Sequence, residues 1–281
     1  MTDENDERRR RPGGVKEITS VANPIIKELR ALTNKKDREA SGAFLSEGLG
    51  FVVEALERGW PVRTLVHAIA LRDDRRVQQA AARTVAAGGQ VLEVSEAVLA
   101  AITRRDNPQQ VLGIFEQRWQ RLELLKPAQD ATLVALDRVR DPGNLGTIIR
   151  TADAAGASGV VLIGECTDPF ALEAVRATMG SLLAIPLYRC SEDEFLAWQG
   201  HAGAQVIATH LDGAVDYRTV DYAAKPTVLL MGNEQSGLPD RLAEAADVRV
   251  RIPQQGSAES LNLAIATAVM LYEARRHLLA L

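Results

Sequence analysis

The chain has 281 residues, of which 46% are hydrophobic and 4% aromatic, and its formal net charge is −4. This length and hydrophobic content suffice for a large core and favour two domains over one. Two cysteines, Cys166 and Cys190, are too few for a disulfide framework and form no CxxC site, which favours a reducing, cytoplasmic setting. The histidines show no metal-ligand spacing, no apolar run is long enough to span a membrane, and the first residues lack a signal peptide's apolar stretch. We therefore expect no metal and no membrane partner.

Charge is distributed unevenly along the chain. Residues 1–121 hold 20 Lys and Arg against 17 Asp and Glu, a net +3, whereas residues 122–281 hold 13 against 20, a net −7. The opposite signs suggest a polyanion as partner of the first half and a neutral or cationic ligand for the second. The basic runs at Arg8–Arg11 and Asn34–Arg38 fit a solvated surface equally well.

The first half predicts a small α/β domain over residues 15–121. Residues 1–14, "MTDENDERRRRPGG", are typical of a disordered charged tail. Helical segments are expected near Pro24–Leu32 and Gly50–Arg58, and strands at 63–70, 90–95 and 111–116. The stretch "QRWQRLELLKPAQDA" that begins at Gln117 has charges, a proline and no strand pattern, so we place a linker at 122–131.

The second half, residues 132–281, predicts a mostly parallel sheet with helices on both faces. Short apolar runs alternate there with helical segments. The runs are 132–139, 159–165, 184–190, 205–212, 226–234 and 248–255. The last segment, 259–281, predicts a long amphipathic helix. Its apolar positions are expected in the core, namely Leu261, Ala264, Ile265, Val269, Leu271 and Tyr272.

A tight turn and a helical pattern follow the first of these runs, in "DPGNLGTIIRTADAAG" from Asp141 to Gly156. One face of the predicted helix is apolar at the i, i+3, i+4, i+7 offsets, through Leu145, Ile148, Ile149 and Ala152. Arg150 projects from the other face among small residues. Taken alone, the stretch favours an ordinary capped helix with a solvated arginine.

Three strands of the second half end in polar loops that contain glycine. They are "DPGNLGT" at Asp141, "MGNEQSGLPD" at Met231 and "IPQQGSAESLN" at Ile252. None is a phosphate-binding P-loop or a G-x-G-x-x-G dinucleotide site, so kinase and hydride-transfer functions lose their main support. Because open α/β sheets bind ligands at the carboxyl ends of their strands, we expect these loops to converge on one site.

In this order and at these distances from the chain end, the loops resemble the three signature motifs of the SpoU/TrmH RNA 2′-O-methyltransferases of the SPOUT superfamily. Residues 18–56 resemble the N-terminal substrate-binding domain of many such enzymes, a ribosomal-protein-like RNA-binding α/β fold. The resemblance implies methylation of a ribose 2′-hydroxyl in RNA with S-adenosylmethionine and no metal, by a homodimer whose C-terminal domain contains a deep trefoil knot. Ribosomal RNA is favoured because of the attached N-terminal domain. Transfer RNA, or a noncatalytic RNA-binding protein on the same fold, are the alternatives.

The resemblance also assigns residues. The catalytic set is Asn144, Arg150, Glu234, Ser260 and Asn262. The S-adenosylmethionine contacts are Thr209, Leu211, Gly232, Ile252 and Leu261. The candidate RNA contacts are Lys27, Arg30, Lys35, Lys36, Arg38, Arg176 and Thr178. Two positions depart from the family pattern, with Glu173 where lysine is common and Thr178 where serine is usual. These departures put in question whether the predicted helix that contains both residues binds RNA.

A guanidinium is a poor proton acceptor near neutral pH, so we expect Arg150 to orient the ribose or a phosphate and to stabilise the developing alkoxide. Asn144 would then hold either Arg150 or Glu234.

Overall fold

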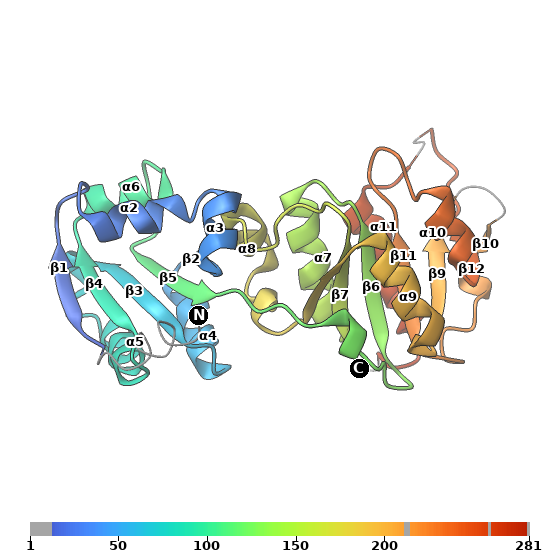
Figure 1. Cartoon of the computed structure of the whole chain (residues 1–281), viewed down its shortest axis with the longest axis horizontal. Coiled ribbons are helices and arrows are strands. Elements are labelled where there is room, and N and C mark those ends of the chain that lie inside the picture. Colours follow the sequence, from blue (N-terminus) through green and yellow to red (C-terminus); the bar gives the residue numbers. More distant parts are fainter. Residues whose placement is uncertain (1–12, 211–213, 258–259, 280–281) are drawn as a thin grey trace. The chain divides into compact units, whose positions relative to one another are not determined.

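The computed structural model describes residues 13–210, 214–257 and 260–279, which form two compact units (Figure 1). Unit 1 comprises the chain up to Gln117 together with Phe170–Leu183, and unit 2 comprises Arg118–Pro169 and the chain from Ala184 onward. Most of the predicted charged tail, including Arg8–Arg11, lies outside the described residues. No described helix combines the length and the apolar character needed to cross a bilayer.

Unit 1 is built on a five-stranded mixed sheet, which agrees with the predicted small α/β domain. The strands in spatial order are β1 (Val15–Ile18), β4 (Gln90–Val94), β3 (Val62–Ala68), β5 (Val111–Glu116) and β2 (Ala43–Glu47). β5 runs antiparallel to both of its neighbours, and the other pairs are parallel. Helices α2 (Pro24–Ala31) and α6 (Glu96–Thr103) cover one face, and α4 (Leu49–Glu57) and α5 (Arg75–Ala86) the other (Figure 1). A short helix, α3 (Lys35–Ser41), precedes β2.

A segment from the second half of the sequence completes the core of unit 1. Phe170–Leu183 contains α8 (Leu172–Thr178) and a 3₁₀ turn at Ser181–Leu183. The ring of Phe170 is 1% exposed and lies 5.0 Å from that of Phe44, centre to centre. Trp60 Nε1 donates a hydrogen bond of 3.2 Å to the carbonyl of Leu183. Unit 1 is therefore formed by two separate stretches of the chain, and the predicted domain boundary near residue 121 stays a prediction.

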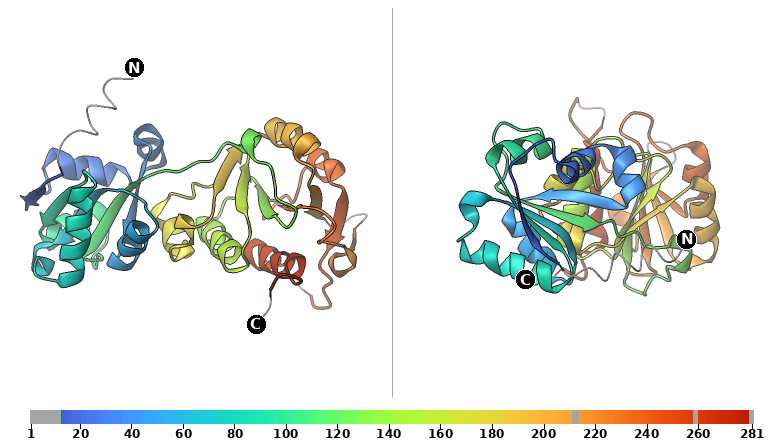
Figure 2. Two further views of the ribbon diagram at one scale, coloured as in Figure 1. Left: turned by 90° about the horizontal axis from the view of Figure 1, so that it is seen from below. Right: turned by 60° about the vertical axis from the view of Figure 1, so that its left-hand side comes forward.

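Unit 2 is an all-parallel seven-stranded sheet, as the repeated apolar runs predict. The strands in spatial order are β10 (Val215–Asp216), β12 (Val248–Arg251), β9 (Gln205–Thr209), β11 (Thr227–Met231), β6 (Thr132–Asp137), β7 (Gly159–Ile163) and β8 (Leu187–Cys190). Helices α7 (Pro142–Ala154) and α11 (Leu263–Ala274) cover one face, and α9 (Glu192–Ala202) and α10 (Asp240–Ala245) the other (Figure 2). The trefoil knot stays a prediction.

Helix α7 shows the predicted apolar face, since Leu145, Ile148, Ile149 and Ala152 are all fully buried. It begins three residues earlier than the apolar pattern indicates. The Asp141 side chain caps it by accepting a hydrogen bond of 2.6 Å from the backbone N of Asn144, and a proline occupies the first turn, where its missing N–H costs nothing.

Helix α11 is shorter than predicted and only partly buried. Ala264 and Leu271 lie in the core, but the side chains of Leu261, Ile265 and Tyr272 are 37%, 54% and 50% exposed. The prediction that these three belong to the core is therefore wrong. Ile265 and Tyr272 are two helical turns apart and share one side of α11, because the sheet and the neighbouring α7 cover only the opposite side. An apolar stripe is thus left at the surface of unit 2.

Candidate functional site

A pocket of about 920 Å³ lies at the carboxyl ends of four parallel strands of unit 2, where the three glycine-bearing loops meet. Its walls come from the segments after β6, β9, β11 and β12 and from the start of α11. Besides the backbone of the loops, the lining includes Arg140, Asn144, Thr209, His210, Met231, Asn233, Glu234, Leu238, Arg251, Ile252, Ser260, Leu261 and Asn262.

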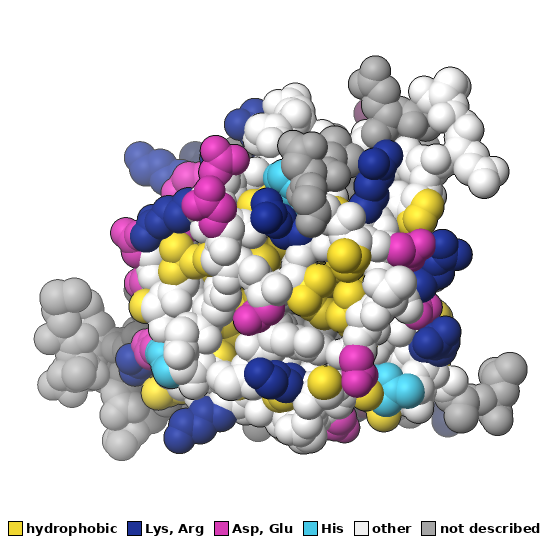
Figure 3. Space-filling view, turned by 90° about the vertical axis from the view of Figure 1, so that its right-hand side faces the viewer, with side chains coloured by type: hydrophobic (Ala, Val, Ile, Leu, Met, Phe, Trp, Pro, Cys, Tyr) yellow, Lys and Arg dark blue, Asp and Glu magenta, His cyan; other side chains and the backbone are white. Residues whose placement is uncertain are grey.

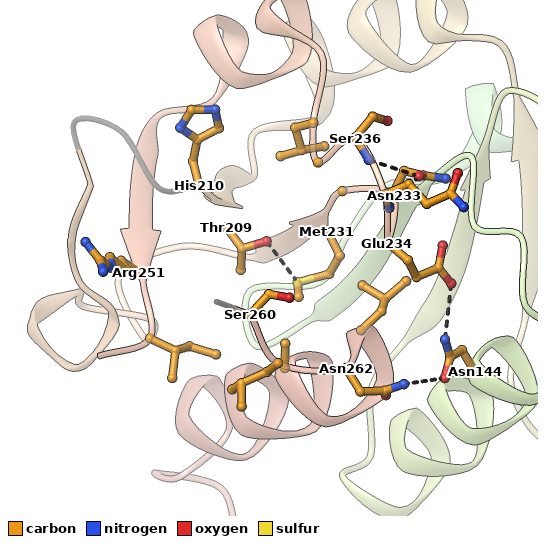
Figure 4. Close-up of a pocket in the computed structure, with 18 of the residues that line it drawn as sticks. Asn144, Thr209, His210, Met231, Asn233, Glu234, Ser236, Arg251, Ser260 and Asn262 are labelled. Atoms are coloured by element: carbon orange, nitrogen blue, oxygen red, sulfur yellow. Dashed lines mark hydrogen bonds between the residues drawn. The ribbon is translucent and has the colours of Figure 1, made fainter. Parts of the chain in front are cut away.

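One residue from each loop takes part in a chain of hydrogen bonds along this pocket (Figure 4). Asn262 Nδ2 donates to Asn144 Oδ1 at 2.9 Å, and Asn144 Nδ2 donates to Glu234 Oε1 at 3.2 Å. Asn262 Oδ1 accepts from two backbone N–H groups in the first turn of α11, those of Ala264 and Ile265.

The direction of this chain is fixed by its two ends. Backbone N–H groups only donate and a carboxylate only accepts, so both amides have a single consistent orientation. Successive bonds of one sense polarise one another. The arrangement therefore holds the Glu234 carboxylate in place from the N-terminus of α11.

The second loop is held in a compact shape by Asn233, which is 7% exposed. Its Oδ1 accepts from the backbone N of Gln235 at 2.9 Å, and its Nδ2 donates to the carbonyl of Arg138 at 2.6 Å. Arg138 has a φ of 47°, which is uncommon for a residue other than glycine. At Gly232 an added Cβ would come within 2.5 Å of Leu238 N, so the loop closes only on a glycine. The sequence does contain a signal for this role of Asn233, because an asparagine between the two glycines of a loop is typical of a turn in which the side chain accepts from the backbone two residues later.

The pocket has different chemistry at its two ends (Figure 4). Glu234, Asn144 and Asn262 lie at one end, and His210 and Arg251 at the other. Between them, Thr209 Oγ1 lies 3.8 Å from Met231 Sδ, with the apolar side chains of Leu238, Val250, Ile252, Leu261 and Leu263 also contributing to the lining. A ligand with a flat apolar portion and a polar end suits such a pocket.

The structure brings together most of the residues that the resemblance assigns. Four of the predicted catalytic residues line the pocket, which are Asn144, Glu234, Ser260 and Asn262. So do four of the predicted cofactor contacts, Thr209, Gly232, Ile252 and Leu261, whereas Leu211 lies outside the described residues. Arg150 does not line the pocket and lies on the exposed face of α7. Arg140, His210, Met231, Gln235 and Arg251 line it without having been singled out from the sequence.

The candidate RNA contacts of unit 1 differ in exposure. Lys27, Arg30, Lys35 and Lys36 are exposed. Arg38 is 3% exposed, and its Nη1 donates to the carbonyl of Leu32 at 2.9 Å, so it stabilises the turn between α2 and α3.

The two candidates on α8 are engaged inside unit 1. Thr178 is fully buried, and its hydroxyl donates to the carbonyl of Val175 at 2.7 Å. Arg176 Nη2 lies 2.6 Å from Oε2 of Glu47, whose side chain is 3% exposed. Thr178 therefore offers no accessible atom to RNA, and Arg176 neutralises a buried carboxylate.

Comparison with known protein families identifies the class of protein to which this fold and pocket belong. The SpoU rRNA Methylase family matches residues 131–272, and the MRM3-like substrate binding domain matches residues 23–113. The fold, the pocket and these matches define a two-domain α/β protein with a C-terminal methylase domain. The chain belongs to the SpoU rRNA methylase family.

Three relatives illustrate the match. An AdoMet-bound rRNA methyltransferase from Sinorhizobium meliloti is 62% identical, with a TM-score of 0.91 over 95% of this chain and 99% of that one. The 23S rRNA (guanosine(2553)-2'-O)-methyltransferase RlmP of Bacillus subtilis is 33% identical over 261 residues, which is 93% of this chain and 100% of the relative. The tRNA (guanosine(18)-2'-O)-methyltransferase of Escherichia coli K12 is 36% identical over only 155 residues, 55% of this chain and 67% of its own length.

Proposed function

We propose that this protein transfers a methyl group from S-adenosylmethionine to a ribose 2′-hydroxyl of ribosomal RNA. The observation that carries the proposal is the chain from Asn262 through Asn144 to Glu234, which joins the three loops at one end of a ligand-sized pocket. Such a chain places a hydrogen-bond acceptor at a fixed point beside the space where a cofactor and a ribose would meet.

The pocket suits S-adenosylmethionine in size and chemistry. Its volume of about 920 Å³ falls in the usual range for small-ligand sites, and its middle portion is apolar. Thr209, Gly232, Ile252 and Leu261 would hold the cofactor, which when bound supplies a methyl group that is electrophilic because it is attached to a sulfonium. The Sinorhizobium meliloti relative binds AdoMet.

The residues of the hydrogen-bonded chain from Asn262 to Glu234 position the nucleophile, which is the ribose 2′-oxygen. Oε2 of Glu234 accepts from the backbone N of Arg140 at 3.5 Å, and Oε1 from Asn144. The carboxylate is thereby aimed so that it can accept a hydrogen bond from the ribose 2′-hydroxyl and keep that oxygen in line with the methyl group. The Ser260 hydroxyl offers a further hydrogen bond in the same pocket.

The protein acts as a homodimer that pairs through α7 and α11. These helices lie side by side on one face of the sheet (Figure 2), and α11 leaves Ile265 and Tyr272 exposed. Arg150 lies on the exposed face of the adjoining α7, outside its own pocket. In a two-fold dimer through this face, Arg150 would serve the pocket of the partner subunit.

Mixing two inactive variants tests the dimer. When Arg150→Ala and Glu234→Ala dimers exchange subunits, each mixed dimer contains one pocket with an intact Glu234 and an intact Arg150 from the other subunit. Activity should then recover to about a quarter of the unmutated level. Absence of recovery, with subunit exchange confirmed by mass, would place Arg150 in its own pocket, and a monomer by sedimentation at micromolar concentration would overturn the dimer.

Ribosomal RNA is preferred over transfer RNA because of unit 1. The match to the Escherichia coli tRNA enzyme spans 55% of this chain, whereas the substrate-binding domain matches residues 23–113. A noncatalytic role would not need the intact Asn262–Asn144–Glu234 chain. The cytoplasm, where ribosomal RNA is made in bacteria, is the expected location, and both cysteines are free.

The decisive experiment maps ribose methylation across total RNA from cells with and without the gene. We expect one ribosomal RNA position to lose its methyl group in the deletion and to regain it when purified protein and S-adenosylmethionine are added. Asn144→Ala is the matched inactive control. A lost methylation in transfer RNA would correct the substrate, and absence of S-adenosylmethionine binding in calorimetry would overturn the function.

A further inference from the structure

Arg140 lies at the end of the pocket where the hydrogen-bonded chain ends. It belongs to the turn between β6 and α7 and lines the pocket with an exposed side chain. Its backbone N donates to Glu234 Oε2, and its guanidinium Nη1 donates to Oε1 of Gln235 at 3.3 Å. The first contact places the backbone of Arg140 beside Glu234, and the second places its guanidinium beside Gln235, the next residue. The other two basic residues of the pocket, His210 and Arg251, lie at the opposite end from Glu234 (Figure 4).

The charge of Arg140 is not neutralised within the described residues. No carboxylate of the described chain lies within 4.0 Å of its guanidinium, and one neutral amide oxygen accepts from one of its five N–H groups. Arg138, two residues earlier, is a contrast: its Nε and Nη2 donate to Oδ2 of the buried Asp137 at 2.9 and 2.8 Å. These hydrogen bonds raise the pKa of Arg138. Arg138 thus belongs to the fold, whereas Arg140 has donors to offer a ligand.

A polyanionic substrate needs a cation at this place. Residues 122–281 carry a net charge of −7, and the pocket contains the Glu234 carboxylate. The end of unit 2 that carries β10 and β12 shows basic and acidic side chains interspersed, rather than one broad basic surface among its described residues (Figure 3). A phosphodiester brought beside Glu234 would therefore meet repulsion, unless a local positive charge offsets it.

We propose that Arg140 binds a phosphate of the RNA strand next to the ribose that is methylated. The inference rests on the proposed function, because it takes RNA as the substrate of this pocket. A planar guanidinium donates two parallel hydrogen bonds to a phosphate, and its anchor on Gln235 leaves such a pair of donors available. Arg140 is in this view a binding residue that sets the position of the strand and takes no part in methyl transfer.

The test compares Arg140→Ala, Arg140→Lys and Arg140→Gln with Arg121→Ala. Arg121 is an exposed arginine of unit 2 that is paired with Glu123 and lies outside the pocket lining, so its loss changes the net charge equally. The probe is ribosomal RNA purified from the deletion strain. Three quantities are measured: the Kd for this RNA over a series of salt concentrations, kcat at saturating RNA, and the Kd for S-adenosylmethionine.

We expect Arg140→Ala to weaken RNA binding about tenfold at 0.1 M salt, since it removes a hydrogen-bonded charge. The slope of log Kd against log salt should fall by roughly 0.7 to 0.9, the value for one lost phosphate contact. The kcat and the Kd for S-adenosylmethionine should stay within a few-fold. Arg140→Lys should keep the salt slope and part of the affinity, Arg140→Gln should behave as Arg140→Ala, and Arg121→Ala should behave as the unmutated protein.

Two results would overturn the proposal. An unchanged salt slope in Arg140→Ala would show that no phosphate is bound, and a lowered kcat that Arg140→Gln restores would show that Arg140 only holds Gln235 and Glu234. Failure of the proposed function is distinguishable, because the unmutated protein would then transfer no methyl group to this RNA. The binding measurements would still decide whether Arg140 contacts it.

Discussion

Asn262 makes two kinds of hydrogen bond that substitution can separate. Its Oδ1 accepts from Ala264 N at 2.9 Å and Ile265 N at 3.3 Å, which caps α11, and its Nδ2 donates to Asn144 at 2.9 Å. Asn262→Ala removes the cap and the donor together. Asn262→Asp keeps an oxygen for the cap and places a negative charge at a helix N-terminus, where it is favourable, but it replaces the donor with an acceptor.

The magnitudes follow from these contacts. Loss of the cap costs about 1 kcal/mol of stability, which in a domain of about 150 residues lowers the melting temperature by about 2–4 °C. Loss of the donor leaves Asn144 free to turn away from Glu234. A displacement of about 1 Å at a positioning group costs roughly a hundredfold in rate, or about 2.7 kcal/mol in the barrier.

Thermal unfolding and kcat/KM on the mapped ribosomal RNA form the assay. Asn262→Ala should lose both stability and activity. Asn262→Asp should melt within about 1 °C of the unmutated protein and still lose roughly tenfold to a hundredfold in kcat/KM. Near-normal kcat/KM in Asn262→Asp would refute the idea that this chain positions Glu234, and an unchanged melting temperature in Asn262→Ala would refute the cap.

Further outcomes are expected elsewhere in the molecule. Arg150→Ala should reduce methyl transfer by roughly a hundredfold or more, while the Kd for S-adenosylmethionine in calorimetry stays within a few-fold. Arg150→Lys should not restore activity, because a point charge lacks the planar pair of donors. Near-normal turnover in Arg150→Ala would show that Arg150 takes no part in the reaction. A variant reduced to unit 2, with Phe170–Leu183 replaced by a short linker, should keep cofactor binding and lose RNA affinity in filter binding; undiminished affinity would place the RNA surface on unit 2. Burial raises the pKa of Cys166 to about 11 and of Cys190 to about 12, so both thiols should react slowly with an alkylating reagent at about pH 8. Since folding raises both pKa values, the stability that the neutral thiols contribute should be present below about pH 9 and be lost as the pH rises towards 11. Rapid labelling of the folded protein would contradict the slow reaction, and a free energy of unfolding that does not fall between about pH 9 and pH 11 would contradict the contribution to stability.

The parallel sheet of unit 2 is readable from sequence because its strands are buried on both faces. β6, β7 and β11 are buried along their whole length and therefore appear as continuous apolar runs. The glycine-bearing segments after β6, β11 and β12 are equally visible as polar stretches that follow apolar runs, and in the second of them Gly237 has a φ of 67°, which favours glycine. The sequence left two possible partners for Asn144, namely Arg150 and Glu234. Arg150 is near Asn144 in the sequence, but Glu234, which is far from it in the sequence, is the residue to which Asn144 donates a hydrogen bond in the structure.

Tertiary contacts explain what the sequence did not reveal. An apolar position on a helix can face the core or another subunit, so periodicity alone cannot distinguish Leu271, which is buried, from Ile265, which is exposed. The basic run containing Arg38 predicts an exposed surface, but the packing of α3 turns that side chain inward to a backbone carbonyl. The sequence of α8 also does not indicate whether this helix packs against the sheet of unit 1, as it does, or against the sheet of unit 2.

The packing of Phe170–Leu183 into unit 1 has a consequence for the order of events during synthesis. The strands of unit 1 are complete once Gln117 has been made, but the contacts that Phe170, Arg176 and Leu183 make with Phe44, Glu47 and Trp60 form only after translation has passed Leu183. At about 5–20 residues per second, this delay lasts roughly 3 to 13 s. Throughout that interval the nascent first unit lacks the ring contact from Phe170 and the 2.6 Å ion pair from Arg176, and Glu47 has the longer contact of 3.7 Å with Arg105. We therefore expect the N-terminal half to need chaperone protection on the ribosome until the second half begins to emerge.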